Sequence, residues 1–275
     1  MRWFEELKGP IRAGTEEGTA GAGTAVAGFV TTSRGALLVD AFTLPADGAA
    51  LYQAARQMAG QVAGLVYTHE HGDHFVGGSG YPKDLLVLAS QATAAGLRGL
   101  VDRNAAYIRE QGLDLRLPTV EFGAREFGAR VVLQWAPEVV LVELGGHTRG
   151  STVVHVPSED TVFAGDLVFA TGLPWVGDAD LDRWVAAMSE IGSWNPARVI
   201  PGHGPVSGPE ILARHREWLD RFAGRLGELR AGGAPAGEAL NRLAAEFDLF
   251  TASGYDERLR APLLAALGQR FGFPA

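Results

Sequence analysis

The sequence predicts a protein of the α/β class, on three observations. Short apolar runs of strand length, separated by turn residues, gather in two clusters, one before residue 70 and one between residues 131 and 164. A stretch with helical spacing of apolar residues interrupts the first cluster, and the last third of the chain shows the same spacing. With 275 residues and 47% hydrophobic composition, the chain is long enough to bury a large core.

The first cluster begins with a predicted hairpin. Residues 26–31 and 36–39 are apolar runs of strand length, and the Ser-Arg-Gly segment between them suits a tight turn. A helix is expected next, because Pro45 fits a first helical turn and Gly60 fits a helix end. Its apolar face consists of Leu51, Ala54, Ala55 and Met58. A third strand, residues 62–67, then runs directly into a histidine-rich segment.

The second cluster contains four more predicted strands, at residues 131–133, 139–144, 152–156 and 161–164. Beyond it we expect a long helix that follows Pro209. Its apolar stripe consists of Leu212, Leu219, Phe222, Leu226 and Leu229. The glycine-rich segment 231–235 ends this helix, a second helix follows, and Pro262 fits the start of a third, short one.

Composition excludes several classes of protein. The formal net charge is −8 and no run of Lys or Arg occurs, so the basic surface of a nucleic-acid-binding protein is missing. The first residues do not resemble a leader peptide and no apolar segment is long enough to cross a bilayer, so we expect a soluble, cytoplasmic protein without a membrane partner. The absence of cysteine excludes disulfides, thiolate ligands and cysteine nucleophiles. Any metal ion must be held by His, Asp or Glu.

Residues 68–74, with the sequence THEHGDH, are the most informative segment of the chain. They place three imidazoles and two carboxylates in six residues, directly after a predicted strand. Imidazole and carboxylate are ligands that suit zinc or iron, and Gly72 allows a turn that a larger residue would strain. A surface cluster of histidines is the alternative reading, but such crowding of imidazole and charge is unusual without a bound partner. The segment therefore predicts a metal-binding loop.

The His-x-His-x-Asp-His pattern of this loop resembles the signature of the metallo-β-lactamase superfamily. The other elements of that family's pattern follow in the family's order: Asp40 after an apolar run, His147 in Gly-His-Thr, Asp166 in Ala-Gly-Asp, and His203 in Pro-Gly-His-Gly-Pro. The resemblance covers about residues 28–206, and its motifs include five of the seven histidines. It implies a four-layer αβ/βα sandwich with C-terminal helices, in which the motif elements converge at one edge of the paired sheets.

The resemblance also implies a set of metal ligands. One metal ion would be held by His69, His71 and His147, and a second by Asp73, His74 and His203. Asp166 would bridge the two ions, for which zinc is favoured, with iron or manganese as alternatives. Asp40 is expected to belong to the catalytic machinery without being a ligand, by accepting a ring N–H from a ligand histidine or by positioning the loop.

The remaining polar residues of these segments receive other roles. Asp73, besides binding metal, is expected to return a proton to the leaving group, unless water does so. Glu70 is expected to point away from the metals as a solvated or supporting charge, and His155 and His215 are expected to be structural. The segment 104–135 and the loop 171–178 are predicted to line the entrance to the site, and Trp175 is either its apolar wall or part of the core.

The predicted reaction is hydrolysis by a metal-bridging hydroxide, because two cations sharing a water lower its pKa toward neutrality. A carboxylate at position 166 resembles the glyoxalase-II-like and lactonase-like branches, whereas several β-lactamase branches carry cysteine or serine there. No basic cluster for glutathione is apparent, so a carboxylic ester, thioester or lactone with an apolar acyl group is expected. The alternatives are a β-lactamase, a phosphodiesterase, an iron-dependent persulfide-dioxygenase-like enzyme with one metal ion, and an inactive metal-binding interaction module.

Two predictions concern organisation. Residues 1–208 are expected to form the catalytic domain, and residues 209–275 a C-terminal helical extension that packs on the same domain. The expected partner is a small-molecule substrate, with no nucleic acid and no membrane, and a homodimer is left open.

Overall fold

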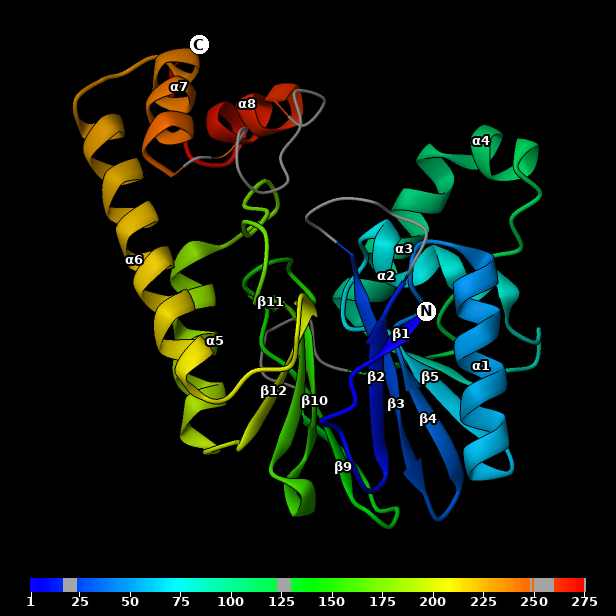
Figure 1. Ribbon diagram of the computed structural model, residues 1–275. Helices are drawn as coiled ribbons and strands as arrows, with labels where there is room; N and C mark the ends of the chain where they lie inside the picture. The colour runs from blue at the N-terminus through cyan, green and yellow to red at the C-terminus, as the bar shows by residue number, and fades with distance from the viewer. Residues whose placement is uncertain (17–23, 123–129, 248, 250–259, 275) are drawn as a thin grey trace.

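The computed structural model describes residues 1–16, 24–122, 130–247, 249 and 260–274. Two β-sheets lie face to face in the middle of the molecule, and helices cover the outer side of each sheet (Figure 1). The order of layers is therefore helix, sheet, sheet, helix. This architecture confirms the α/β class and the four-layer sandwich predicted from the sequence.

The first sheet has the strand order β1-β2-β3-β4-β5-β6-β7. Its strands are β1 (Arg2–Trp3), β2 (Ile11–Thr15), β3 (Val26–Thr32), β4 (Gly35–Val39), β5 (Val62–Val66), β6 (Val87–Ser90) and β7 (Val120–Phe122). Strands β1 to β4 pair antiparallel, and β4 to β7 pair parallel. Parallel neighbours need a crossover connection, which α1 (Pro45–Ala59) provides between β4 and β5.

Four further short elements belong to this half of the molecule. They are α2 (Gly72–Phe75), a 3₁₀ turn (Val76–Gly80), α3 (Gln91–Arg103) and α4 (Ala105–Glu110). Helix α3 connects β6 to β7, and α2 follows directly on the histidine-rich loop.

The second sheet has the order β12-β11-β10-β9-β8. Its strands are β8 (Arg130–Leu133), β9 (Val139–Glu143), β10 (Thr152–Val156), β11 (Thr161–Phe169) and β12 (Arg198–His203), with a 3₁₀ turn at Pro157–Glu159. The pairs β8-β9, β9-β10 and β10-β11 are antiparallel. Strands β11 and β12 are parallel, and α5 (Leu181–Ser193) forms the crossover between them.

The space between the sheets is filled by aliphatic side chains from both of them. Val30 and Leu37 of the first sheet and Leu141, Val154 and Ile200 of the second belong to one buried cluster. The outer face of each sheet packs against helices in a separate cluster. With both faces covered, the strands carry nearly continuous apolar runs, which is why they can be read directly from the sequence.

Three helices follow the second sheet: α6 (Glu210–Ala231), α7 (Ala236–Phe247) and α8 (Arg260–Gln269). Helix α6 packs on α5 and on β11, α7 packs on α6, and α8 packs on α7. Pro262 lies in the first turn of α8, where a missing backbone N–H does no harm. No helix within the described part of the chain combines the length and apolar character needed to span a membrane.

Candidate metal centre

The residues singled out in the sequence lie at one end of the two sheets. Asp40 follows β4, the histidine-rich loop follows β5, and His147 follows β9. Asp166 lies within β11, where the register with β12 shifts, and His203 is the last residue of β12. Because β4 pairs parallel with β5, and β11 with β12, their carboxyl ends meet at the same edge, which is where ligands bind in sheets of this kind.

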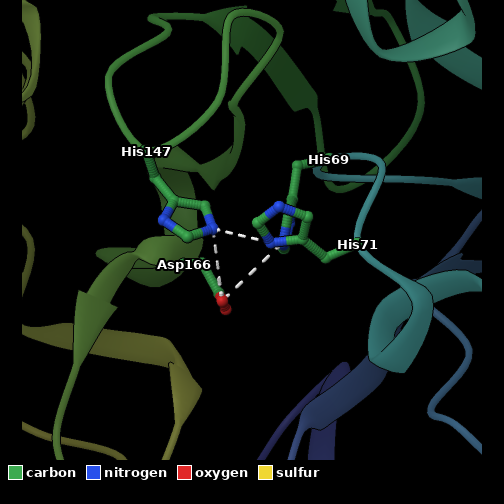
Figure 2. Close-up of side chains that lie close together, drawn as sticks. All are labelled: His69, His71, His147 and Asp166. Atoms are coloured by element: carbon green, nitrogen blue, oxygen red, sulfur yellow. Dashed lines mark hydrogen bonds and ion pairs between the residues drawn. The ribbon is translucent and has the colours of Figure 1, made fainter. Parts of the chain in front are cut away.

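The first group of ligand atoms belongs to His69, His71, His147 and Asp166, and these atoms all lie within 4.8 Å of one another. Figure 2 shows these side chains pointing toward a common centre. Oδ2 of Asp166 lies 3.7 Å from Nε2 of His69 and 3.5 Å from Nε2 of His147. His69, His147 and Asp166 are almost fully buried.

The second group belongs to Asp73, His74 and His203, again within 4.8 Å of one another. Nε2 of His203 lies 3.3 Å from Oδ2 of Asp73 and 3.3 Å from Oδ2 of Asp166. Nε2 of His74 lies 3.0 Å from Oδ1 of Asp166. The Asp166 carboxylate is thus within reach of both groups.

Each of the three histidines of the first group has its outer ring nitrogen held by a neighbour. Thr68 donates its hydroxyl hydrogen to Asp40 and so accepts the Nδ1–H of His69, at 3.0 Å. His71 donates from Nε2 to Oδ2 of Asp178 at 3.2 Å. Such outer partners fix the tautomer and the orientation of metal-binding imidazoles.

His147 is held in the same way by the loop that follows β11, since its Nδ1–H donates to the backbone carbonyl of Trp175 at 3.1 Å. The two inner nitrogens, Nε2 of His147 and Nδ1 of His71, then face each other at 3.0 Å. Two neutral rings in this arrangement would oppose two lone pairs, which repel, so a proton or a metal ion must lie between the two nitrogens. The geometry of this pair fits a shared metal ion.

Several buried polar atoms of the site support the same interpretation. Within the described residues, Nε2 of His69, Nε2 of His74 and Oδ1 of Asp166 are buried and make no hydrogen bond of normal geometry, although the last two face each other at 3.0 Å. Buried polar atoms without a hydrogen bond are costly and normally have a partner. Imidazole nitrogens with carboxylate oxygens are the donor set of zinc and iron sites, whereas calcium sites use oxygen alone.

Asp40 belongs to neither group and lies behind His74. Its Oδ2 accepts from Nδ1 of His74 at 2.9 Å, and its Oδ1 accepts from the backbone N–H of Thr68 at 2.8 Å. Its backbone has a positive φ of 59°, a conformation that Asp tolerates better than most residues. Burial raises the pKa of Asp40. The side chain thus holds the ring of His74 and the start of the histidine-rich loop in place.

The electrostatics of the site reflect the crowding of opposite charges. Burial lowers the pKa of His147 to about 3, so its imidazole is neutral. Burial also acts to lower the pKa of His203, but the Asp166 and Asp73 carboxylates outweigh it and raise that pKa to about 10. Burial acts to raise the pKa of Asp166, and the His203 and His74 imidazoles reverse this and hold it well below its usual range. A cation that binds here must displace protons from histidines.

The loop after β11 takes part in the site more directly than the sequence suggests. Trp175 binds His147 through its carbonyl and donates its indole N–H to Oδ2 of Asp178 at 2.9 Å. No sequence motif points to Asp178, although it lies in the predicted entrance loop. Of the other predicted entrance segment, residues 123–129 lie outside the described residues, and the rest forms α4, β7, β8 and their connections.

The two histidines predicted to be structural lie outside both groups of ligand atoms. His155 stacks on Trp194 with ring centroids 5.0 Å apart. His215, on α6, stacks on Phe169 and lies against Trp184. Phe169 in turn stacks on His203, so the aromatic packing of α6 reaches the wall of the site.

Comparison with known proteins agrees with this geometry. The model of the metallo-β-lactamase superfamily matches residues 20–84 and 136–203. The chain is 27% identical over 169 residues to the metallo-β-lactamase type 2 of Bacteroides fragilis, covering 59% of this chain and 61% of that protein. It is 30% identical over 153 residues to the hydroxyacylglutathione hydrolase of Fuscovulum blasticum, covering 54% and 56%. The matched region thus spans about three fifths of the length of these curated relatives.

A solved structure, TMB-1, superposes with a TM-score of 0.63 over 81% of this chain and 99% of its own, at 20% sequence identity. At that identity the likeness concerns the fold alone. The two matched segments include Asp40 and all seven candidate ligand residues. On the combined evidence of sequence match, fold and the order of its ligand residues, the chain belongs to the metallo-β-lactamase superfamily.

Proposed function

We propose that this protein is a hydrolase that binds two divalent metal ions. His69, His71 and His147 would hold one ion, and Asp73, His74 and His203 the other. The single observation that carries the proposal is the position of Asp166, whose carboxylate lies 3.0 to 3.7 Å from nitrogens of both groups. Zinc is the favoured ion, with iron or manganese as alternatives, because the donors are imidazole and carboxylate.

Two bound cations would supply hydroxide near neutral pH and polarise the oxygen of the group under attack. The protein's own residues do the rest. The Asp73 side chain is 36% exposed, against 4% for Asp166, so it is the ligand carboxylate that meets solvent and substrate. The ionised Asp73 carboxylate can take up the proton that the attacking water loses and pass it to the departing oxygen or sulfur, unless water does so. Asp40 does not reach the reacting atoms and acts by orienting His74.

For the substrate we propose a carboxylic ester, a thioester or a lactone. Asp166 supports this choice, since hydrolases with two similar metal ions carry a carboxylate at this place. The similarity to a hydroxyacylglutathione hydrolase supports it as well. A β-lactam is the second candidate, because the other curated relative is a metallo-β-lactamase.

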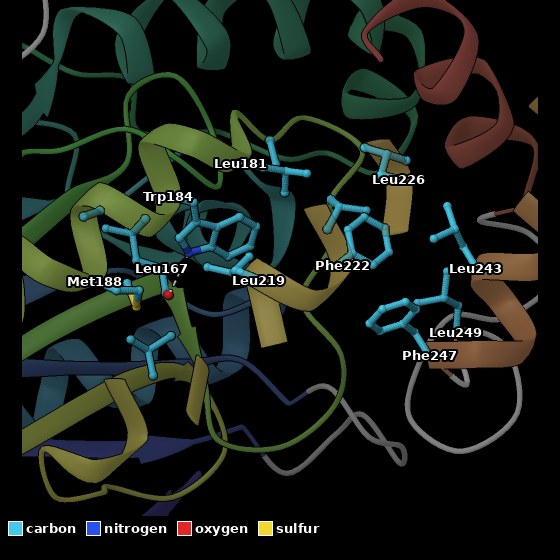
Figure 3. Close-up of a cluster of buried hydrophobic side chains, with 14 of the residues drawn as sticks. Leu167, Leu181, Trp184, Met188, Leu219, Phe222, Leu226, Leu243, Phe247 and Leu249 are labelled. Carbon is cyan, nitrogen blue, oxygen red and sulfur yellow. Dashed lines mark hydrogen bonds between the residues drawn. The ribbon is translucent and has the colours of Figure 1, made fainter. Parts of the chain in front are cut away.

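We also propose that residues 1–208 are the catalytic domain and that residues 209–275 are a helical extension on the same domain. Side chains of α6, among them Leu219, Phe222 and Leu226, share a buried cluster with Leu167 of β11 and Trp184 of α5 (Figure 3). Trp184 also lies against the ring of His147, at 5.1 Å between centroids. The extension thereby supports the wall of the metal centre.

The test is a metal count joined to a substrate comparison. Purified protein is expected to contain two metal ions per chain, and kcat/KM with fully loaded protein is expected to be highest for an ester, thioester or lactone. A β-lactam or phosphodiester that leads by tenfold or more would contradict the substrate proposal. One metal ion per chain, found as iron, would instead favour oxygen chemistry.

A further inference from the structure

Glu70 is the one acidic residue of the histidine-rich loop that belongs to neither group of ligand atoms. It lies between His69 and His71, and its side chain points away from the imidazoles toward helix α3 and the loop that carries His147. It is partly buried. Of the two roles expected from the sequence, a solvated charge and a supporting charge, the structure therefore favours the second. Its contacts indicate a role.

The first contact is with Thr148, the neighbour of His147 in the chain. The buried Thr148 hydroxyl donates to Oε2 of Glu70 at 3.0 Å. The backbone N–H of Thr148 donates to the Ser151 hydroxyl at 2.9 Å, which fixes the turn around it. One hydrogen bond therefore links a loop of the first sheet, with two ligand histidines, to a loop of the second sheet, with the third.

The second contact is with α3, which has a glycine where the carboxylate lies. A Cβ on Gly96 would come within 2.7 Å of Cγ and 2.9 Å of Oε1 of Glu70. Glycine within a helix lowers helix stability by about 1 kcal/mol relative to alanine. Gly96 therefore makes α3 less stable but leaves room for the Glu70 side chain.

The start of α3 holds the same loop from the other side. The hydroxyls of Ser90 and Thr93 both donate to the carbonyl of Gly150 at 3.0 Å, and Ser90 also caps the helix. Helix α3, Glu70 and the 147–151 loop thus form a polar network behind the first metal site. The network joins the 69–71 loop through Glu70, on the side of that loop away from the facing rings of His71 and His147.

We propose that Glu70 is a positioning residue: through Thr148 it holds His147 at the distance from the other two histidines of its site that a shared metal ion requires. The inference rests on the metal-binding part of the proposed function. It assigns Glu70 no contact with substrate and no proton transfer. Loss of the link should weaken one metal site and leave the other unchanged, because Asp73, His74 and His203 lie outside the network.

The experiment measures Zn²⁺ affinity at both sites, by competition with a chromophoric chelator, for metal-free wild type and variants. Glu70→Ala and Thr148→Val are each expected to weaken one of the two sites about tenfold, the lower end of the effect of such outer partners. The double variant should bind no more weakly than the weaker single variant, since both changes remove one bond. Glu70→Gln should stay within about threefold of wild type, because its amide oxygen still accepts from Thr148.

Gly96→Ala distinguishes a loss of Glu70 positioning from a general loss of protein stability. It displaces the Glu70 side chain but improves helix propensity, so metal-free protein should unfold at or above the wild-type temperature while the same site weakens. Gly224→Ala on α6 is the matched control, since a Cβ there meets nothing within 4 Å, and it should leave both affinities unchanged.

Three results would overturn the inference. The variants could retain both affinities, both sites could weaken together, or the double variant could show the sum of the two single losses. The proposed function fails separately, and is recognised by wild-type protein that binds no metal ion at all.

Discussion

Asp166 is the residue on which both groups of ligand atoms depend. Its two oxygens lie close to the nitrogens of four histidines, and it is 4% exposed. We expect Asp166→Ala to lose bound metal and nearly all turnover, and not merely to raise KM, because the bridging group is removed and four imidazoles lose their counter-charge. Metal analysis and kcat measured on the same preparation check this. The control is His155→Ala, which should keep its metal ions; an Asp166→Ala protein with two ions and full activity would refute the bridge.

His215 gives a prediction on pH and stability. Burial lowers its pKa from 6.5 to about 3, so it stays neutral in the folded protein. Above pH 6.5 neither the folded nor the unfolded state is protonated, and the group has no effect. As the pH falls below that value, the unfolded state gains a proton that the folded state cannot bind, and stability falls by about 1.4 kcal/mol per pH unit.

His215→Phe removes this proton while it keeps a ring against Phe169. The free energy of unfolding, measured with urea near neutral pH and about 1.5 units lower, should therefore fall less for the variant than for the wild type. Metal content should be unchanged. Equal losses for the two proteins would show that His215 is protonated in the folded state.

Among single residues, the sequence reveals the candidate ligands that belong to a motif. It does not reveal side chains that come into contact from distant parts of the chain. The seven expected ligand residues and Asp40 could be chosen because their residue types and order match a family pattern. Asp178 could not, since its contact with His71 joins residues 107 positions apart. Its only signal is a carboxylate three residues after Trp175 in a loop that was expected near the entrance.

Among the elements, helix α6 offers the clearest test of how the C-terminal extension is integrated. Phe222 is fully buried on the face of α6 that Figure 3 shows turned toward Trp184 and Phe247. Phe222→Ala should cost about 3–5 kcal/mol in unfolding free energy, the usual range for a buried phenylalanine. The exposed Glu217→Ala on the same helix should change it by less than about 0.5 kcal/mol.

Urea unfolding of both variants, followed by fluorescence and by far-UV circular dichroism, checks this prediction. A single transition shifted in both signals is expected, because α6 shares its core with α5 and β11. Two separate transitions, with only the first shifted, would show that residues 209–275 unfold independently of the rest.

The helices and strands that could be predicted from the sequence are those with a clear pattern of apolar residues. Strands β3, β4, β5, β9 and β10 are buried on both faces and read as apolar runs, and α6 shows a long apolar stripe. Helix α3 was not among the expected elements, and Gly96 and Gly99 within it argue against a helix locally. The reason for Gly96 is its contact with Glu70, which no local pattern reveals. Helix α5 was not expected either, although Leu181, Trp184 and Met188 follow helical spacing.

For the whole molecule, the ligands come from both sheets, so bound metal ions would act as crosslinks between them. The chain has no cysteine, and therefore no disulfide can take this role. Chelation should lower the unfolding temperature, and added Zn²⁺ should restore it by an amount that grows with the logarithm of free metal concentration. Differential scanning calorimetry at several buffered Zn²⁺ concentrations measures this. An unfolding temperature that is independent of metal would mean that the unfolded chain binds the ions as tightly as the folded one.

The order of the ligands along the chain has a consequence for biosynthesis. The loop with His69 and His71 follows the fifth strand, whereas Asp166 and His203 belong to the last two. Domains begin to fold from the N-terminus as the chain is made. A nascent chain that ends before residue 203 therefore presents a histidine-rich loop without the groups that complete the two sites. Metal capture is expected to be a late step of maturation, and a translation pause placed before β12 should yield a ribosome-bound chain that holds zinc only weakly.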